Sequence, residues 1–116
     1  MSGDVLDSPV RGVRRVGRMV VVDVDGDIDL NRSGPFQQRL LELLEEGPER
    51  VVVNLESVPY MDSSGVASLV KLLSRAKRQM VGVRLSGLRP RVRSIFEITR
   101  LDTIFEIFVT EEEALA

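Results

Sequence analysis

The strongest constraint on the fold is an alternation of short apolar strand patterns with amphipathic helix patterns along the chain. Strands separated by helices need crossover connections, and crossovers place successive strands parallel in one sheet. We therefore predict a single α/β domain with a mostly parallel central sheet of four to five strands and helices packed against it. The expected strands are 10–16, 19–24, 51–55, 81–85 and 104–109; the expected helices begin near Pro35, span 64–79, begin at Pro90 and form a short acidic tail at 111–115.

The ends of these elements carry their own signals. Asn31 or Ser33 is the expected N-cap of the first helix, with Pro35 in its first turn, and Gly47 followed by Pro48 ends that helix. The strand at 51–55 has no polar alternation, which is typical of a central strand covered on both faces.

The N-terminal residues have a different composition from the rest of the chain. They are polar and interrupted by glycine and proline, which predicts a flexible lead-in at 1–9 and a folded domain spanning 10–116. They lack the basic and apolar pattern of a signal peptide, and no apolar run approaches the length of a membrane span. We therefore expect a cytoplasmic protein without membrane insertion.

Composition excludes several classes of chemistry. The 116 residues include no cysteine and no histidine, which removes disulfides, thiolate metal sites and every Ser-His-Asp arrangement. Neither a GxGxxG nor a GxxxxGK[ST] phosphate-binding loop occurs. We expect no enzyme activity, no cofactor and no resident metal.

The acidic run at 23–31 is the one segment that resembles a metal site. A calcium loop needs glycine at its sixth position and glutamate at its twelfth, and counting from Asp23 or from Asp27 fails this test. A strand end and turn with solvated carboxylates is the favoured interpretation. A metal-dependent enzyme using Asp25, Asp27 and Asp29 is the alternative from another class of function.

The segment from Lys71 to Arg100 is strongly basic, with nine basic residues and a single acidic one, Glu97. Most of these charges fall on the exposed faces of two expected helices. Aromatic residues for base stacking are nearly absent, which argues against direct nucleic-acid binding. A basic surface that contacts an acidic protein partner is the intermediate interpretation.

The candidate functional segment is 60–66, between the strand at 51–55 and the helix at 64–79. It carries Asp62, Ser63 and Ser64, followed by Gly65. Its hydroxyls follow the carboxyl end of an expected parallel strand, where α/β sheets place their sites, and they meet the free N–H groups of a helix start. Two hydroxyls exceed what one cap needs. A helix cap and a phosphorylation site are both consistent with this pattern.

Three segments together resemble one known family. Residues 52–65 (VVNLESVPYMDSSG), 26–29 (GDID) and 88–96 (LRPRVRSIF), with Leu101 and 104–105, are similar to the STAS domain of bacterial anti-sigma factor antagonists. The resemblance covers about Val20 to Ile107. Val66 and Ala67 replace the usual Leu-Gly after the motif glycine, a change expected to affect packing more than chemistry.

This resemblance implies a partner switch. An anti-sigma factor serine kinase, which supplies ATP and Mg²⁺, phosphorylates Ser63, with Ser64 as the alternative. The unphosphorylated domain binds the kinase and releases the sigma factor, and a PP2C-type phosphatase resets the switch. The implied partner-binding residues are Asp29, Asp62, Ser63, Ser64 and Gly65. A STAS scaffold in stress signalling or a regulatory module of a transport system is the alternative.

Overall fold

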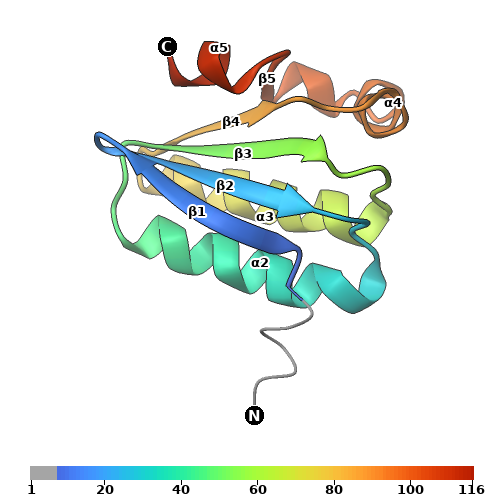
Figure 1. Cartoon of the computed structure of the whole chain (residues 1–116), viewed down its shortest axis with the longest axis horizontal. Helices are drawn as coiled ribbons and strands as arrows, with labels where there is room; N and C mark the ends of the chain where they lie inside the picture. Colours follow the sequence, from blue (N-terminus) through green and yellow to red (C-terminus); the bar gives the residue numbers. More distant parts are fainter. Residues whose placement is uncertain (1–7) are drawn as a thin grey trace.

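The computed structural model describes residues 8–116 and shows one five-stranded sheet (Figure 1). The expected lead-in at 1–9 lies for the most part outside the described residues. The strand order is β1-β2-β3-β4-β5, with β1 antiparallel to β2 and the other pairs parallel. The predicted mostly parallel α/β fold is therefore confirmed. The strands are β1 (Val10–Val16), β2 (Met19–Asp25), β3 (Arg50–Ser57), β4 (Gly82–Ser86) and β5 (Glu106–Phe108).

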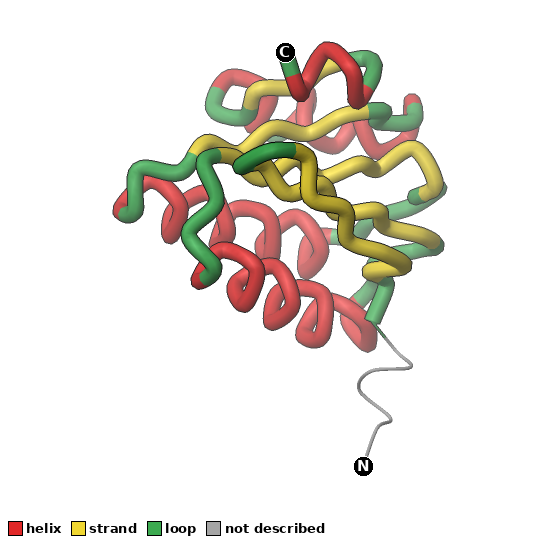
Figure 2. Tube along the Cα trace, turned by 60° about the vertical axis from the view of Figure 1, so that its left-hand side comes forward, coloured by secondary structure: helices red, strands yellow, loops and turns green. Residues whose placement is uncertain are grey.

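Two long helices cover one face of this sheet. Figure 2 shows them side by side beneath the strands. A shorter helix packs against the turn that precedes β5, and the C-terminal helix lies against the other face. Among residues 8–116, no helix combines the length and the apolarity that crossing a bilayer requires. The helices are α2 (Leu30–Glu45), α3 (Ser63–Arg78), α4 (Pro90–Ile98), the 3-10 turn η1 (Leu101–Thr103) and α5 (Glu111–Leu115).

The middle strand, β3, carries the core on both of its faces. Val51 and Val53 belong to the main core between the sheet and the helices, whereas Val52 joins a smaller cluster with Val21 and Ala114. Because side chains alternate along a strand, a strand buried on both faces needs apolar residues at successive positions. The prediction of a central strand at 51–55 is confirmed.

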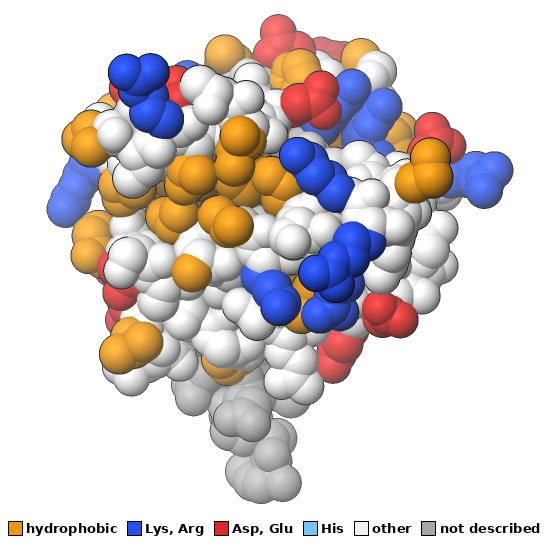
Figure 3. Space-filling view, turned by 180° about the vertical axis from the view of Figure 1, so that it is seen from behind, with side chains coloured by type: hydrophobic (Ala, Val, Ile, Leu, Met, Phe, Trp, Pro, Cys, Tyr) orange, Lys and Arg blue, Asp and Glu red, His pale blue; other side chains and the backbone are white. Residues whose placement is uncertain are grey.

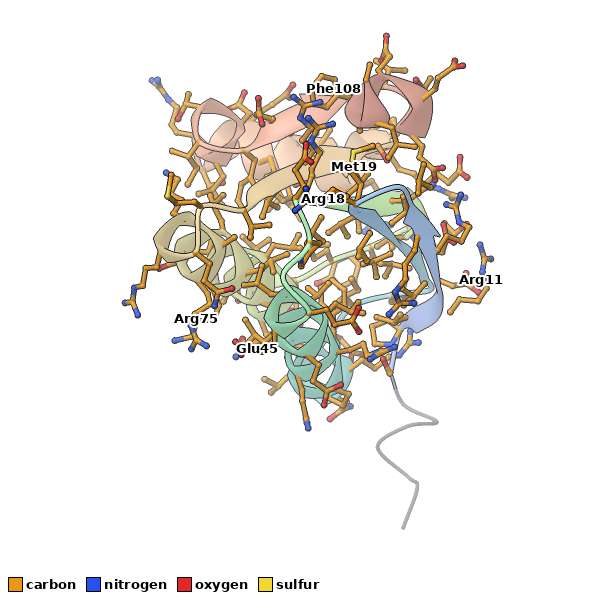
Figure 4. The ribbon with its side chains drawn as sticks, turned by 90° about the vertical axis from the view of Figure 1, so that its left-hand side faces the viewer. Arg11, Arg18, Met19, Glu45, Arg75 and Phe108 are labelled. Atoms are coloured by element: carbon orange, nitrogen blue, oxygen red, sulfur yellow. The ribbon has the colours of Figure 1, made fainter. Side chains whose placement is uncertain are left out.

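Polar contacts hold α5 on the second face of the sheet. Arg50 and Arg84 each donate hydrogen bonds to backbone carbonyls at the C-terminal end of α5. Arg84 also lies over the ring of Phe108, with 5.1 Å from its guanidinium carbon to the ring centre. Figure 4 labels Phe108 beside α5. At the other end, Arg14 pairs with both Asp23 and Glu111. Hydrogen bonds and ion pairs from these arginines therefore help the small apolar cluster to hold α5 on the sheet.

Several predicted boundaries are shifted by one or two residues, and two others are wrong for a clear physical reason. The first helix begins at Leu30 with Asp29 as its N-cap, earlier than the predicted caps Asn31 or Ser33. The Asp29 carboxylate accepts the first free N–H groups and adds a turn, so Pro35 lies in the second turn. The last strand is Glu106–Phe108, shorter than 104–109, because η1 turns the chain first. Gly47, with φ +74°, ends α2 as predicted.

The Glu111 carboxylate makes the fold sensitive to acid. Hydrogen bonds from Arg14 and, more weakly, from Asn54 hold the pKa of Glu111 below its ordinary value, against the opposing effect of burial. A lowered folded-state pKa gives stabilisation that is present above the unfolded-state pKa and is lost as pH falls through the folded-state value. We predict that Glu111→Gln lowers the free energy of unfolding by roughly 0.5–1 kcal/mol at neutral pH.

Urea unfolding at neutral pH and at acid pH measures this difference. The gap between wild type and Glu111→Gln is expected to close as the carboxyl of Glu111 becomes protonated. The neighbouring exposed Glu112 is the control, and Glu112→Gln leaves the free energy of unfolding nearly unchanged at both pH values. An equal gap for Glu111→Gln at both pH values contradicts the prediction.

Candidate functional site

A short backbone bridge joins the two loops that lead into α2 and α3. Ile28 and Met61 pair as an isolated parallel bridge, with Ile28 N–H donating to the Tyr60 carbonyl at 3.0 Å and Asp62 N–H donating to the Ile28 carbonyl at 3.0 Å. Both loops follow the carboxyl ends of parallel strands. The bridge therefore brings Asp29 and Asp62 to the same edge of the sheet, at the starts of two neighbouring helices.

Each of these helices begins with an aspartate cap. Asp29 Oδ1 accepts hydrogen bonds from the backbone N–H groups of Asn31 (3.0 Å) and Arg32 (3.2 Å). Asp62 Oδ1 accepts from the N–H groups of Ser64 (2.9 Å) and Gly65 (3.2 Å). These contacts satisfy N–H groups that have no partner within the helix.

The Asp62 carboxylate is held in its charged form. The Ser64 hydroxyl donates to Asp62 Oδ1 over 2.5 Å and is the main cause of a lowered pKa at Asp62. The backbone N–H groups of Gly65, Ser64 and Leu30 lower the pKa further, while burial opposes them. The site therefore keeps a negative charge at neutral pH, beside Ser63.

The two serines have different environments. Ser63 is the exposed first residue of α3, and its hydroxyl makes no hydrogen bond with any residue in 8–116. Ser64 is half-buried, and its hydroxyl is bound to Asp62. The structure therefore leaves the Ser63 hydroxyl accessible to a binding protein, whereas the Ser64 hydroxyl is bound to Asp62. The sequence alone did not distinguish these two serines.

Gly65 lies where two other side chains leave no room. A Cβ at this position would come within 2.6 Å of Met61 Cγ and 2.9 Å of Ile28 Cγ2. The absence of a side chain therefore allows α3 to start directly against the Ile28–Met61 bridge. Gly65 is itself buried, so it affects the site through packing and not through contact with a partner.

Exposed apolar residues flank the site, and sequence reasoning missed them. Leu30, the first residue of α2, is 76% exposed, and Tyr60 is 37% exposed. The sequence signal that could have identified Leu30 is its position as an apolar residue directly after the capping Asp29. Both side chains leave exposed apolar area on the two loops that the Ile28–Met61 bridge joins.

The acidic run does not gather into a metal site. Asp25 pairs loosely with Arg11 at 3.9 Å, and Arg32 donates to the backbone carbonyl of Asp27 at 2.7 Å. The Asp29 carboxylate caps α2. Within the described part of the chain, no three acidic residues are placed to hold a metal ion.

The fold is a small α/β domain with an antiparallel edge strand on a parallel sheet, and the site lies at two neighbouring helix starts. The STAS domain model matches residues 11–114, and the chain belongs to the STAS domain family. It is 30% identical over 93 residues to the anti-sigma-B factor antagonist of Bacillus subtilis (strain 168), covering 80% of this chain and 84% of that protein.

Solved structures show the same fold. An anti-sigma factor antagonist from Mycobacterium paratuberculosis superposes with a TM-score of 0.86 at 25% identity, covering 94% of this chain and 92% of that one. The Bacillus cell fate determinant SpoIIAA in its phosphorylated form superposes with a TM-score of 0.71 at 24% identity, covering 90% and 95%. The second likeness is one of fold alone.

Close packing at Gly65 gives a direct test of this geometry. We predict that Gly65→Ala lowers the free energy of unfolding by about 1–3 kcal/mol, because the added methyl group overpacks the junction. An alanine in an uncrowded helix would instead stabilise by up to about 1 kcal/mol. Because the nearest clash is with Met61 Cγ, the cost of Gly65→Ala should fall in a Met61→Ala background. Urea unfolding measures the loss in free energy of unfolding caused by Gly65→Ala in each background. Equal losses would contradict a steric clash between residue 65 and Met61.

The Asp62 cap gives a second test. Asp62→Ala is expected to cost about 1 kcal/mol at neutral pH, and Asp62→Asn is expected to cost less because an amide oxygen still caps the helix. The pKa of Asp62 is lowered in the folded state, so its stabilisation is present above the ordinary value of 3.8 and is lost as pH falls through the lower folded-state value.

Denaturant unfolding of wild type and Asp62→Asn across the acid range measures this loss. The two free energies of unfolding should converge as the pH falls. If the difference in free energy of unfolding stays constant down to the lowest pH, the charge of Asp62 does not contribute to stability beyond the hydrogen bonds of the cap.

Proposed function

We propose that this chain is an anti-sigma factor antagonist that acts by partner switching through Ser63. Unphosphorylated, it binds an anti-sigma factor serine kinase and releases the sigma factor; phosphorylated at Ser63, it does not bind. The observation that carries the proposal is the exposed hydroxyl of Ser63 at the start of α3, which forms no hydrogen bond within residues 8–116, whereas the Ser64 hydroxyl is already bound to Asp62. The name of the Bacillus subtilis relative supports it.

The chemistry comes from the partner. The kinase supplies ATP and Mg²⁺, the Ser63 oxygen forms a bond to the γ-phosphorus, the bond to the leaving ADP breaks, and the hydroxyl proton passes to the kinase or solvent. A PP2C-type phosphatase hydrolyses the ester and returns the hydroxyl and inorganic phosphate. This chain acts as substrate and binding module in the cytoplasm, with no catalytic group, cofactor or metal of its own.

The position of Ser63 separates the effect on the fold from the effect on the interface. A phosphoserine adds about −1.5 to −2 charges at neutral pH. At the first residue of α3 that charge lies near free N–H groups and the positive end of the helix dipole, which stabilise anions. Beside the Asp62 carboxylate it creates a concentrated negative surface that an acidic or apolar partner surface cannot cover.

The partner surface includes both helix starts. Asp29 and Asp62 lie at the same edge as Ser63 and Ser64, while Gly65 supports them from below. The exposed Leu30 side chain adds apolar area that a binding partner would remove from water. The proposed interface thus combines carboxylates, hydroxyls and an apolar contact.

Incubation with the anti-sigma factor kinase of the source organism and Mg-ATP, followed by mass spectrometry, tests the proposal. Wild type and Ser64→Ala should take up one phosphate on Ser63, and Ser63→Ala should take up none. Ser63→Ala should bind the kinase as wild type does, and Ser63→Asp should bind at least about tenfold more weakly.

Ser64→Ala is the matched control, because it removes a neighbouring hydroxyl and leaves Ser63 in place. Phosphate on Ser64 would move the switch to that residue. Equal binding by Ser63→Ala and Ser63→Asp would contradict the switch and favour the alternative, a STAS scaffold in stress signalling or a transport system.

A further inference from the structure

A pocket of about 330 Å³ lies next to the Ser63 segment. Tyr60 and Met61, which directly precede Asp62, form one wall, and α4 forms the other. The guanidinium carbon of Arg91 lies 5.6 Å from the centre of the Tyr60 ring, within the range of a cation–π contact. The pocket is therefore walled by the same segment that presents Ser63. Its lining residues are Tyr60, Met61, Arg91, Ser94 and Ile95.

Helix α4 extends this pocket into a longer apolar surface. Ile95 and Ile98 follow Arg91 at four and seven residues, so they share one face of the helix. Ile98 is 81% exposed, while the opposite face is anchored by Phe96, which packs edge-on against Phe105 at 5.5 Å. Figure 3 shows hydrophobic side chains gathered on the side where α4 and the start of α3 lie.

The charges around this surface are basic. Residues 89–100 carry four arginines and one acidic residue, Glu97. Arg89 donates to the backbone carbonyl of Glu56 at 2.9 Å, and within residues 8–116 neither Arg91 nor Arg93 pairs with a carboxylate. An apolar pocket lined by one arginine, Arg91, that pairs with no carboxylate of residues 8–116 is complementary to an acidic segment that carries an apolar side chain.

We propose that this groove docks an acidic segment of the protein partner, with one apolar side chain seated between Tyr60 and Ile95 and with a carboxylate facing Arg91. The identity of that partner as the serine kinase rests on the proposed function. A polyanionic nucleic acid fits less well, because the charged Asp62 carboxylate directly follows Met61 of the pocket wall in the chain. The docked segment contacts residues other than Ser63. Its binding holds the domain so that the Ser63 hydroxyl faces the kinase.

Isothermal titration of the unphosphorylated chain with the kinase tests the docking surface. Arg91→Glu, which reverses a rim charge, and Ser94→Tyr, which fills the pocket from an exposed position, are each expected to weaken binding about tenfold. Raising NaCl from about 50 mM to about 300 mM should weaken wild-type binding more than Arg91→Glu binding.

Arg18→Glu is the matched control, with the same change of charge in the β1–β2 turn at the opposite end of the sheet, where Figure 4 labels Arg18. It should bind as wild type does. If Arg91→Glu and Ser94→Tyr also bind as wild type does, the docking site is overturned, while the Ser63 switch stands on its own test. If both weaken binding but Ser63→Asp does not, the docking site stands and the switch fails.

A second measurement tests the surface without the kinase. A short synthetic peptide of glutamates around one phenylalanine is titrated into the ¹⁵N-labelled chain and followed by NMR. Amide shifts concentrated at residues 60–61 and 91–98, and reduced in Arg91→Glu, support the proposal. Shifts absent from these residues overturn it, whatever the phosphorylation state of Ser63.

Discussion

The backbone bridge between Ile28 and Met61 ties together the two loops on which the rest of the site depends. It sets the starts of α2 and α3 side by side and leaves space for Gly65 but for no larger residue. Asp29 and Asp62 then cap the two helices, so the two carboxylates and the neighbouring hydroxyls share one edge of the sheet. The close packing of Gly65 against Ile28 and Met61 therefore determines where these carboxylates and hydroxyls lie.

That arrangement explains how one added phosphate could change binding without changing the fold. The Ser63 hydroxyl makes no hydrogen bond within residues 8–116 that a phosphate would break, whereas modification of Ser64 would remove a hydrogen bond to the Asp62 cap. Met61 of the wall of the neighbouring pocket directly precedes Asp62, and Arg91 of α4 lines the same pocket. An interface built from charge and a small apolar pocket responds strongly to a new negative charge.

Much of the fold could be predicted from the sequence, because strand and helix periodicities differ and the buried run at 51–55 marks the sheet centre. The first helix cap was misplaced, because Asn31, Ser33 and Asp29 are all competent caps and only the geometry of the incoming loop selects Asp29. The two serines could not be separated, since the choice of hydrogen-bond partner depends on side-chain geometry. Contacts between distant segments, such as Tyr60 with Arg91, leave no local pattern.

In the proposed switch, a phosphate at Ser63 acts on the interface and leaves the fold intact. The most direct measurement compares the chain with and without a full equivalent of phosphate on Ser63, by kinase affinity and by thermal unfolding of the same samples. We predict melting temperatures within about 4–8 °C of each other, equivalent to roughly 1 kcal/mol or less, and an affinity at least about tenfold weaker for the phosphorylated form. Unchanged affinity, or loss of binding through unfolding of the phosphorylated chain, would contradict a switch that acts on the interface alone.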